Sequence, residues 1–162
     1  MPMLDMPLEE LKLYRGTNPR PGDFDEYWDR ALALVDDLSP EVNIRPAAFR
    51  TPAAECFDLT FTGVGGARIY AQYLRPSAAS ALHPAVLMFH GYSGNSGDWS
   101  EKLAYVAAGH SVLALDVRGQ GGRSEDPGGV SGNTLRGHVI RGLDDTPEKL
   151  FYRQVFLDTV QL

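Results

Sequence analysis

Two short apolar runs, each followed at once by a glycine-rich segment, constrain the fold of this chain more than any other feature. Residues 85–89 (AVLMF) precede residues 90–94 (HGYSG), and residues 111–115 (SVLAL) precede residues 116–121 (DVRGQG). Such runs are typical of central parallel strands that helices cover on both faces. Glycine-rich turns at the carboxyl ends of these strands are where open α/β sheets hold their ligands. The pattern predicts an α/β fold with a ligand site at the strand ends.

Length and composition limit the class of protein. The chain has 162 residues, 43% of them hydrophobic, which suits one domain with its own core. A net charge of −6 without a basic stripe predicts no nucleic-acid partner. The single cysteine, Cys56, cannot form an internal disulfide, and we expect a buried structural thiol. No apolar run approaches the ~20 residues of a membrane span, and no signal peptide is recognisable. We expect a cytoplasmic protein without membrane contact.

The amino-terminal part divides into an arm and the start of a domain. Residues 1–22 contain four prolines and predict an extended arm that wraps over a neighbouring surface. Residues 23–162 are expected to form a single α/β domain. Its first helix should run to about Leu38, with Asp23 as the capping residue and Glu26 three positions later.

The remaining elements follow from periodicity. Apolar and polar residues alternate over residues 57–61, and residues 67–74 return as a second strand after a hairpin turn at residues 63–66. A helix is predicted over about residues 99–108. Another begins at Pro147, since proline is favoured in a first helical turn.

The loop after residue 89 is the first candidate site. Glycines let its backbone approach a bound group closely, and they stand at Gly91, Gly94 and Gly97. The backbone N–H of Tyr92 or Ser93 is a natural donor for a developing oxyanion. The alternative is that the glycines only permit a sharp reversal from strand to helix. His90 is interpreted as a structural residue that supports the site.

The second candidate segment contains Arg118, Gly119 and Gln120. A guanidinium just past a strand end can bridge loops through its fixed donors or meet an anionic ligand. Bridging is the commoner outcome, and we expect it here. For Asp116 at the strand end, we expect a carboxylate that caps the following turn rather than a catalytic acid.

A serine nucleophile cannot be assigned. The elbow pattern Gly-x-Ser-x-Gly fails at every glycine-flanked serine, namely Ser93, Ser96, Ser111, Ser124 and Ser131. The histidines are interpreted as structural, and they stand at His83, His90, His110 and His138. Residues 117–143 hold eight glycines and predict a long loop. No metal-ligand spacing or phosphate-binding loop is present, so we expect no metal and no cofactor.

With these residues in hand, the chain resembles the amino-terminal half of the acetyl xylan esterase and cephalosporin-C deacetylase family of α/β-hydrolases. The likeness extends over nearly the whole chain. Its segments are residues 23–28, 57–61, 90–92, 98–99, 116–121, 141–144 and 152–158. The triplet Arg118-Gly119-Gln120 separates this family from α/β-hydrolases at large.

The resemblance implies a mixed, mostly parallel sheet with flanking helices, truncated before the strand that carries the nucleophile. It implies hydrolysis of carboxylic esters by a Ser-His-Asp mechanism, chiefly deacetylation of acetylated sugars, xylo-oligosaccharides or cephalosporin C. Tyr92 would supply an oxyanion N–H and line the substrate pocket with Gly91. The supporting residues would be His90, Arg118, Gly119 and Gln120. Members of the family often form homo-oligomeric rings.

Three hypotheses remain open. In the first, the complete protein is an esterase and the 162-residue chain alone is inactive, because the triad follows its last helix in the family. In the second, the chain is a non-catalytic module that self-associates or binds a partner. In the third, the same fold serves a peptidase or a dienelactone-type hydrolase, which the triplet at residues 118–120 argues against.

Overall fold

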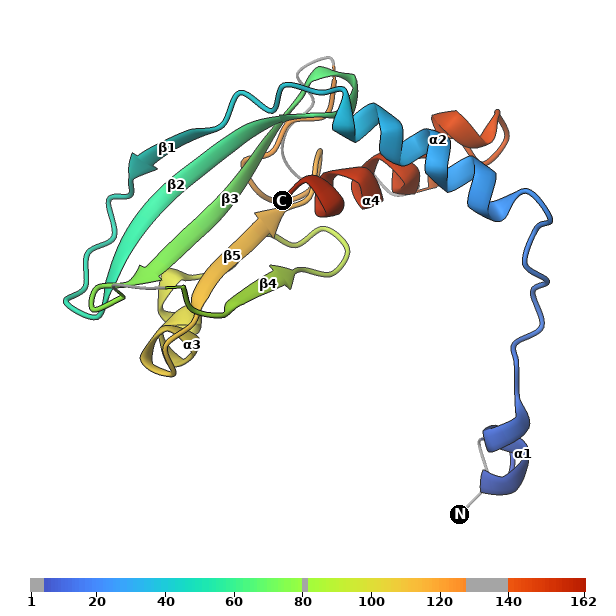
Figure 1. Cartoon of the computed structure of the whole chain (residues 1–162), viewed down its shortest axis with the longest axis horizontal. Helices are drawn as coiled ribbons and strands as arrows, with labels where there is room; N and C mark the ends of the chain where they lie inside the picture. The colour runs from blue at the N-terminus through green and yellow to red at the C-terminus, as the bar shows by residue number, and fades with distance from the viewer. Residues whose placement is uncertain (1–4, 80–81, 128–139) are drawn as a thin grey trace.

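A mixed five-stranded sheet forms the centre of the molecule (Figure 1). The computed structural model describes residues 5–79, 82–127 and 140–162. The strand order is β1-β2-β3-β5-β4. The strands are β1 (Asn43–Pro46), β2 (Ala54–Gly63), β3 (Ala67–Pro76), β4 (Ala85–Phe89) and β5 (Ser111–Asp116). The α/β fold with a mixed sheet is confirmed.

The strand directions differ from the expected mostly parallel sheet. Among the described strands, only β4 and β5 pair in parallel, while β1–β2, β2–β3 and β3–β5 pair antiparallel. The physical reason for the first two pairs is their short connections, because a parallel pair needs a crossover of a dozen or more residues. The predicted hairpin is confirmed, with Gly65 and Gly66 at positive φ in its turn.

Helices lie on both faces of the sheet: α3 (Leu103–Ala107) on one face, and α4 (Phe151–Gln161) with α2 (Phe24–Asp36) packed on it on the other. A further helix, α1 (Leu8–Leu13), lies in the amino-terminal arm. Short 3-10 turns precede α3, at Trp99–Lys102, and α4, at Pro147–Lys149. The three predicted helices are present, but the last begins at Phe151 and not at Pro147, because Leu150 has extended backbone (ψ 126°). Asp23 occupies the N-cap position of α2, but its side chain makes no capping hydrogen bond, because its backbone (φ −97°, ψ 13°) is not in the β-region that capping requires.

The core lies in three clusters that follow these layers. On one face, α3 packs on a cluster that includes Cys56, Leu74 and Val112. The opposite face is built around Ile69 and Leu115. A third cluster joins α2 and α4 through residues Ala31, Val64 and Leu157. Cys56 is the buried thiol that was expected, and burial raises the pKa of its Sγ.

One strand is less buried than predicted. β5 is buried along most of its length, as expected for a central strand. β4 is the last strand of the described sheet, and its Leu87 and Phe89 side chains are 46% and 51% exposed. The prediction that both faces of β4 are covered is therefore wrong for the face with Leu87 and Phe89. Among the described residues, neither a further strand nor a helix covers that face.

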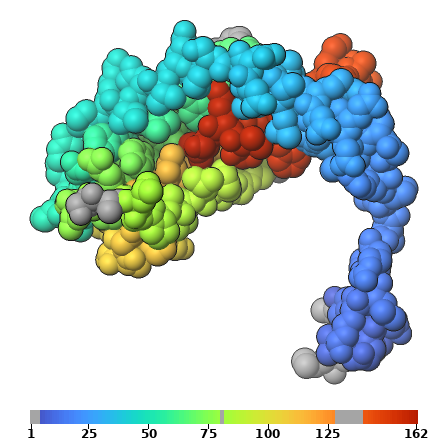
Figure 2. Space-filling view, viewed as in Figure 1, coloured from blue at the N-terminus to red at the C-terminus, as the bar shows by residue number. Residues whose placement is uncertain are grey.

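The amino-terminal arm stands away from the body. Figures 1 and 2 show α1 separated from the sheet by an extended segment. α1 has no buried residue. The boundary at residues 22 and 23 stays a prediction. The middle of the predicted loop 117–143 lies outside the described residues, together with Ser131 and His138.

Candidate active site

The loops that follow β4 and β5 lie side by side, because the two strands are parallel neighbours. Phe89 pairs with Leu115 at the end of the shared register. His90 joins the loops one residue further on: its Nε2 accepts a hydrogen bond from the Val117 N–H at 2.9 Å. Its Nδ1 lies 2.7 Å from the Gly91 carbonyl oxygen. This arrangement places the ring proton on Nδ1 and fixes both loops to one imidazole.

Gln120 orients the loop after β4. Its Oε1 accepts a hydrogen bond of 2.7 Å from the Ser93 N–H, although the two residues come from different loops. Ser93 has φ +58°, a left-handed conformation that is uncommon for a residue other than glycine. The Gln120 side chain is therefore placed to hold this turn, and it is itself buried.

This contact separates the two donor candidates. The Ser93 N–H is already bonded to Gln120. Among the described residues, no acceptor is recorded for the Tyr92 N–H. A donor free of protein acceptors can serve an oxygen that gains negative charge during a reaction. The geometry is therefore compatible with the prediction that the Tyr92 N–H is the oxyanion donor. It argues against the Ser93 N–H in that role.

The Asp116 carboxylate connects the two loops by hydrogen bonds to the backbone of each. One carboxylate oxygen accepts from the Ser96 N–H at 2.5 Å and the other from the Arg123 N–H at 2.7 Å. The Asp116 carbonyl accepts from the Ser124 hydroxyl. A Cβ at Gly122 would lie 2.2 Å from the Asp116 carboxylate, so glycine is required there. The expected structural role of Asp116 fits these contacts.

Lys102 is a supporting residue that the sequence did not reveal. Its side chain is 0% exposed, and its Nζ donates to the Asp98 carbonyl at 2.7 Å and to the Ser96 carbonyl. Burial lowers the pKa of this ammonium group, while Glu101 acts in the opposite direction. In the sequence Lys102 is one charged residue on a short helix, and no local signal marks it as buried.

Arg118 fixes the second loop to α4. Its Nε and one terminal nitrogen donate to the two Asp158 carboxylate oxygens at 2.7 and 2.6 Å, and the Val64 carbonyl accepts a third bond of 3.0 Å. The other terminal nitrogen of Arg118 lies 3.6 Å from the Asp126 Oδ1. Burial raises the pKa of Asp158, and Arg118 counteracts that effect. The guanidinium is buried and fully engaged, so the bridging interpretation fits and a direct ligand contact does not.

Gly119 allows the chain to turn after Arg118. Its φ is +60°, a conformation that glycine adopts without steric cost. Its N–H donates to the Ser124 carbonyl at 3.3 Å. The three residues of the triplet therefore have different roles. Arg118 binds α4, Gly119 allows the turn, and Gln120 bonds to the neighbouring loop.

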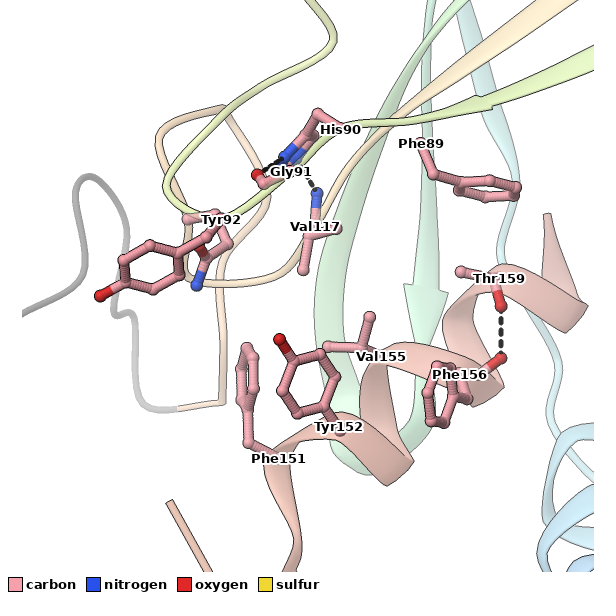
Figure 3. A pocket seen from close by; sticks show the side chains of 11 residues that line it. Phe89, His90, Gly91, Tyr92, Val117, Phe151, Tyr152, Val155, Phe156 and Thr159 are labelled. Atoms are coloured by element: carbon pink, nitrogen blue, oxygen red, sulfur yellow. Dashed lines mark hydrogen bonds between the residues drawn. The ribbon is translucent and has the colours of Figure 1, made fainter. Parts of the chain in front are cut away.

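A pocket of about 320 Å³ opens between these loops and α4. Figure 3 shows His90, Gly91 and Tyr92 on one side of it, facing Phe151, Tyr152 and Val155 of α4. The other lining residues are Phe89, Val117, Gln120, Phe156 and Thr159. The pocket is mostly apolar with few polar groups, an arrangement that suits a small organic ligand. The predicted site residues Gly91, Tyr92, His90 and Gln120 all line it.

Other predicted groups lie elsewhere. Ser111 Oγ is 2.8 Å from His83 Nε2, but this pair stands at the start of β5, opposite the loops. Ser124 is buried beneath Asp116 and Tyr70. Over the described ranges, no cluster of three or more His, Cys, Asp or Glu side chains is placed to hold a metal ion. The helices within these ranges are too short or too polar to cross a membrane.

Comparison with known proteins agrees with this geometry. The fold and the paired loops define the α/β-hydrolase class, to which the structurally similar esterases belong. A family profile described as acetyl xylan esterase (AXE1) matches residues 1–162. The chain belongs to the acetyl xylan esterase family.

Two solved structures are similar over almost the whole chain. Acetyl xylan esterase 1 from Thermoanaerobacterium sp. is 57% identical with a TM-score of 0.88, over 98% of this chain and 50% of that one. The acetyl xylan esterase from Paenibacillus sp. R4 is 31% identical with a TM-score of 0.84, over 96% of this chain and 50% of that one. This chain therefore spans about half the length of these relatives.

A curated relative is more distant. The dihydrolipoyllysine-residue acetyltransferase component of the acetoin cleaving system from Cupriavidus necator is 30% identical over 121 residues, which cover 71% of this chain and 31% of that protein.

Proposed function

We propose that the complete protein is a serine carboxylesterase that removes acetyl groups from small acetylated sugars, xylo-oligosaccharides or cephalosporin C. The observation that carries the proposal is the Tyr92 N–H at the pocket, which has no acceptor among the described residues, whereas the neighbouring Ser93 N–H donates to Gln120. Membership of the acetyl xylan esterase family supports the same reaction.

The residues of this chain would act on the carbonyl oxygen of the ester. When a nucleophile attacks the carbonyl carbon, that oxygen gains negative charge, and the Tyr92 N–H donates a hydrogen bond to it. Gly91 keeps the loop open beside the substrate, since no atom outside its immediate neighbours lies within 4 Å of an added Cβ. His90, Arg118, Gly119 and Gln120 hold the donor in place. No metal or cofactor is proposed.

The Ser-His-Asp triad is proposed for the half of the relatives' length that this chain does not span. The test is hydrolysis of p-nitrophenyl acetate by the 162-residue chain and by a protein extended to the relatives' length. We expect turnover only from the longer protein. Rapid turnover by the 162-residue chain that Ser93→Ala abolishes would overturn the assignment and indicate a different nucleophile.

We also propose a cytoplasmic location and assembly into a homo-oligomer. The single, buried and unpaired Cys56 suits a reducing compartment. Exposed apolar side chains on β4 and α4, among them Phe89 and Phe156, suit an interface. Fractionation of the native cell and sedimentation of the complete protein test these two points.

A second candidate function rests on the same apolar surface. The chain would then be a non-catalytic module that binds a partner or a second copy of itself through Leu87 and Phe89 of β4 and Phe156 and Val160 of α4. A stable folded dimer at micromolar concentration without esterase activity would favour this function. A folded monomer in sedimentation would remove its basis.

A further inference from the structure

Arg153 on α4 is a buried cation that the proposed ester site does not use. Its side chain is 6% exposed. Its Nε is buried and has no hydrogen-bond partner. In the part of the chain that the structure describes, no carboxylate forms an ion pair with it. A buried polar group without a partner is uncommon in folded proteins and indicates a missing interaction.

The neighbouring arginines show that this charge is in excess. Arg118 is paired with Asp158, and Arg141 is paired with Asp126. Arg118 also lies 3.6 Å from Asp126. Arg153 also lines an open pocket together with Arg118, Arg141 and Asp126. Three guanidinium groups thus share two buried carboxylates, and Arg153 is the one left over.

The Arg153 side chain borders a second pocket of about 260 Å³ between α2 and α4. This pocket is separate from the loops at the strand ends, although Phe156 contributes to both. Its walls are mainly aromatic rings and prolines, namely Pro21, Phe24, Tyr27, Trp28, Pro147 and Phe156. Trp28 packs edge-on against Tyr27 and Phe156, at centroid distances of 5.4 and 6.0 Å. These contacts give the pocket defined walls.

Tyr27 does not neutralise the cation. The Arg153 guanidinium lies 5.7 Å from the centroid of the Tyr27 ring, and the Tyr27 hydroxyl donates to the Pro147 carbonyl at 2.9 Å. Burial raises the pKa of Tyr27, and Arg153 counteracts this through its charge and through a side-chain hydrogen bond. The phenol therefore stays protonated at neutral pH and offers a ring face rather than a charge.

Two carboxylates stand near the pocket but are exposed. Asp23 lines its rim, and Glu148 follows Pro147. Neither forms an ion pair with Arg153. Hydrogen bonds at Glu148 lower its pKa, and the Arg153 charge acts in the same direction, but Glu148 is exposed and so does not replace a buried partner. Their negative charge would weaken the binding of an anion, and this effect can be measured separately.

We propose that the pocket between α2 and α4 binds a small carboxylate carried on a single aromatic or apolar ring, with the carboxylate on Arg153. A guanidinium recognises a carboxylate through parallel charge-assisted hydrogen bonds. The aromatic walls accept a ring by stacked or edge contacts. An apolar cavity of about 150 Å³ holds benzene, so 260 Å³ has room for a ring and its acid group. A strongly hydrated anion such as phosphate would match these walls poorly.

The test is a titration of the ¹⁵N-labelled 162-residue chain with phenylacetate, followed through the indole N–H signals. We expect a saturable shift at Trp28 and none at Trp99, which stacks on Phe49 on the other face of the sheet. Benzyl alcohol, which has the ring without the charge, and acetate, which has the charge without the ring, should each bind about tenfold more weakly or worse.

Substitutions assign the site. Arg153→Gln should weaken phenylacetate binding by about 10- to 100-fold, and Arg153→Lys, which keeps the charge without the planar fork, should be intermediate. Asp23→Asn should strengthen binding slightly. Arg45→Gln, on the exposed strand β1, is the control and should bind like the parent. Equal binding of benzyl alcohol, equal shifts at both tryptophans, or unchanged affinity in both Arg153 variants would overturn the proposal.

Discussion

The two sides of the candidate active site are built in contrasting ways. The loops after β4 and β5 are held by buried polar groups, with Asp116, Lys102 and Gln120 each bonded to backbone of these loops. Of the polar atoms in these three side chains, only the Gln120 Nε2 is buried without a partner among the described residues. The surface beside them, on β4 and α4, is apolar and open, with Phe89 51% and Phe156 50% exposed. One side is held by hydrogen bonds within the chain, and the other lacks a covering layer in the described structure.

The two sides differ in how far this chain alone determines their structure. A polar network inside a protein stabilises a unique arrangement only when its members are satisfied. Most polar groups of the loops meet that condition through contacts within residues 90–126 and with α4. The apolar side would be completed by contacts that these residues do not make. The loop that carries the proposed oxyanion donor is therefore held within this chain, while the pocket beside it is open.

The largest expected effect concerns the anchor between the second loop and α4. Arg118→Met leaves Asp158 buried and unpaired, and we expect a loss of about 3–5 kcal/mol in the free energy of unfolding. Arg30→Met removes an exposed pair with Glu26 and should cost about 0.5 kcal/mol or less. Urea denaturation measures both. Similar losses for the two variants would show that the buried network does not hold this side of the site.

The next largest loss of stability is expected at Gly122, whose backbone lies close to the Asp116 carboxylate. Gly122→Ala would place a Cβ 2.2 Å from the Asp116 carboxylate, which must move and weaken its bonds to both loops. We expect a loss of about 1–3 kcal/mol. Gly22→Ala is the matched control, because nothing lies within 4 Å of its added Cβ. A Gly122→Ala protein as stable as the control would contradict the geometry given for Asp116.

Alanine substitutions at two phenylalanines test whether the apolar side of the site is open in solution. Phe61 is 4% exposed in the core and Phe89 is 51% exposed on β4. Phe61→Ala should cost about 3–5 kcal/mol, and Phe89→Ala about 1 kcal/mol. The measurement is again urea denaturation, with sedimentation to follow self-association. An equal cost at both positions would mean that β4 is covered in solution, and the contrast between the two sides would fail.

The smallest effect is a pH dependence at Lys102. Burial lowers its pKa in the folded state below the ordinary value of 10.5. Between the two pKa values the unfolded chain binds more protons at this site, so the contribution of Lys102 to stability rises with pH towards 10.5. We expect Lys102→Met to remove this rise, and Lys149→Met, at an exposed lysine, to keep it. Unfolding curves from about pH 8 to pH 10 compare them. Parallel slopes in all three proteins would contradict the burial of Lys102.

Periodicity and turn chemistry predicted most of the local structure. The alternation over residues 57–61, the hairpin turn and the helices that became α2 and α4 depend on neighbours in sequence, and all are present. The exposure of β4 could not be predicted in this way. An apolar run is the same in sequence whether its outer face is covered or open, because the covering layer belongs to other segments.

The sequence was sufficient to predict where the site lies. It was not sufficient to predict most of the contacts that hold it together. The glycines and the triplet indicated the two loops. The bond from Ser93 to Gln120 joins residues 27 positions apart, and that from Arg118 to Asp158 joins residues 40 apart. Such pairs depend on tertiary folding, and no spacing rule gives them. Lys102 and Arg153 were missed as buried cations for the same reason.

The central claim is that this chain supplies a preformed oxyanion donor at Tyr92. Its most direct test replaces the amide that precedes Tyr92 with a backbone ester in the complete protein, which removes this N–H and leaves the side chain unchanged. We expect kcat for p-nitrophenyl acetate to fall about 10²- to 10³-fold with little change in KM. An unchanged kcat in a folded protein would contradict the claim.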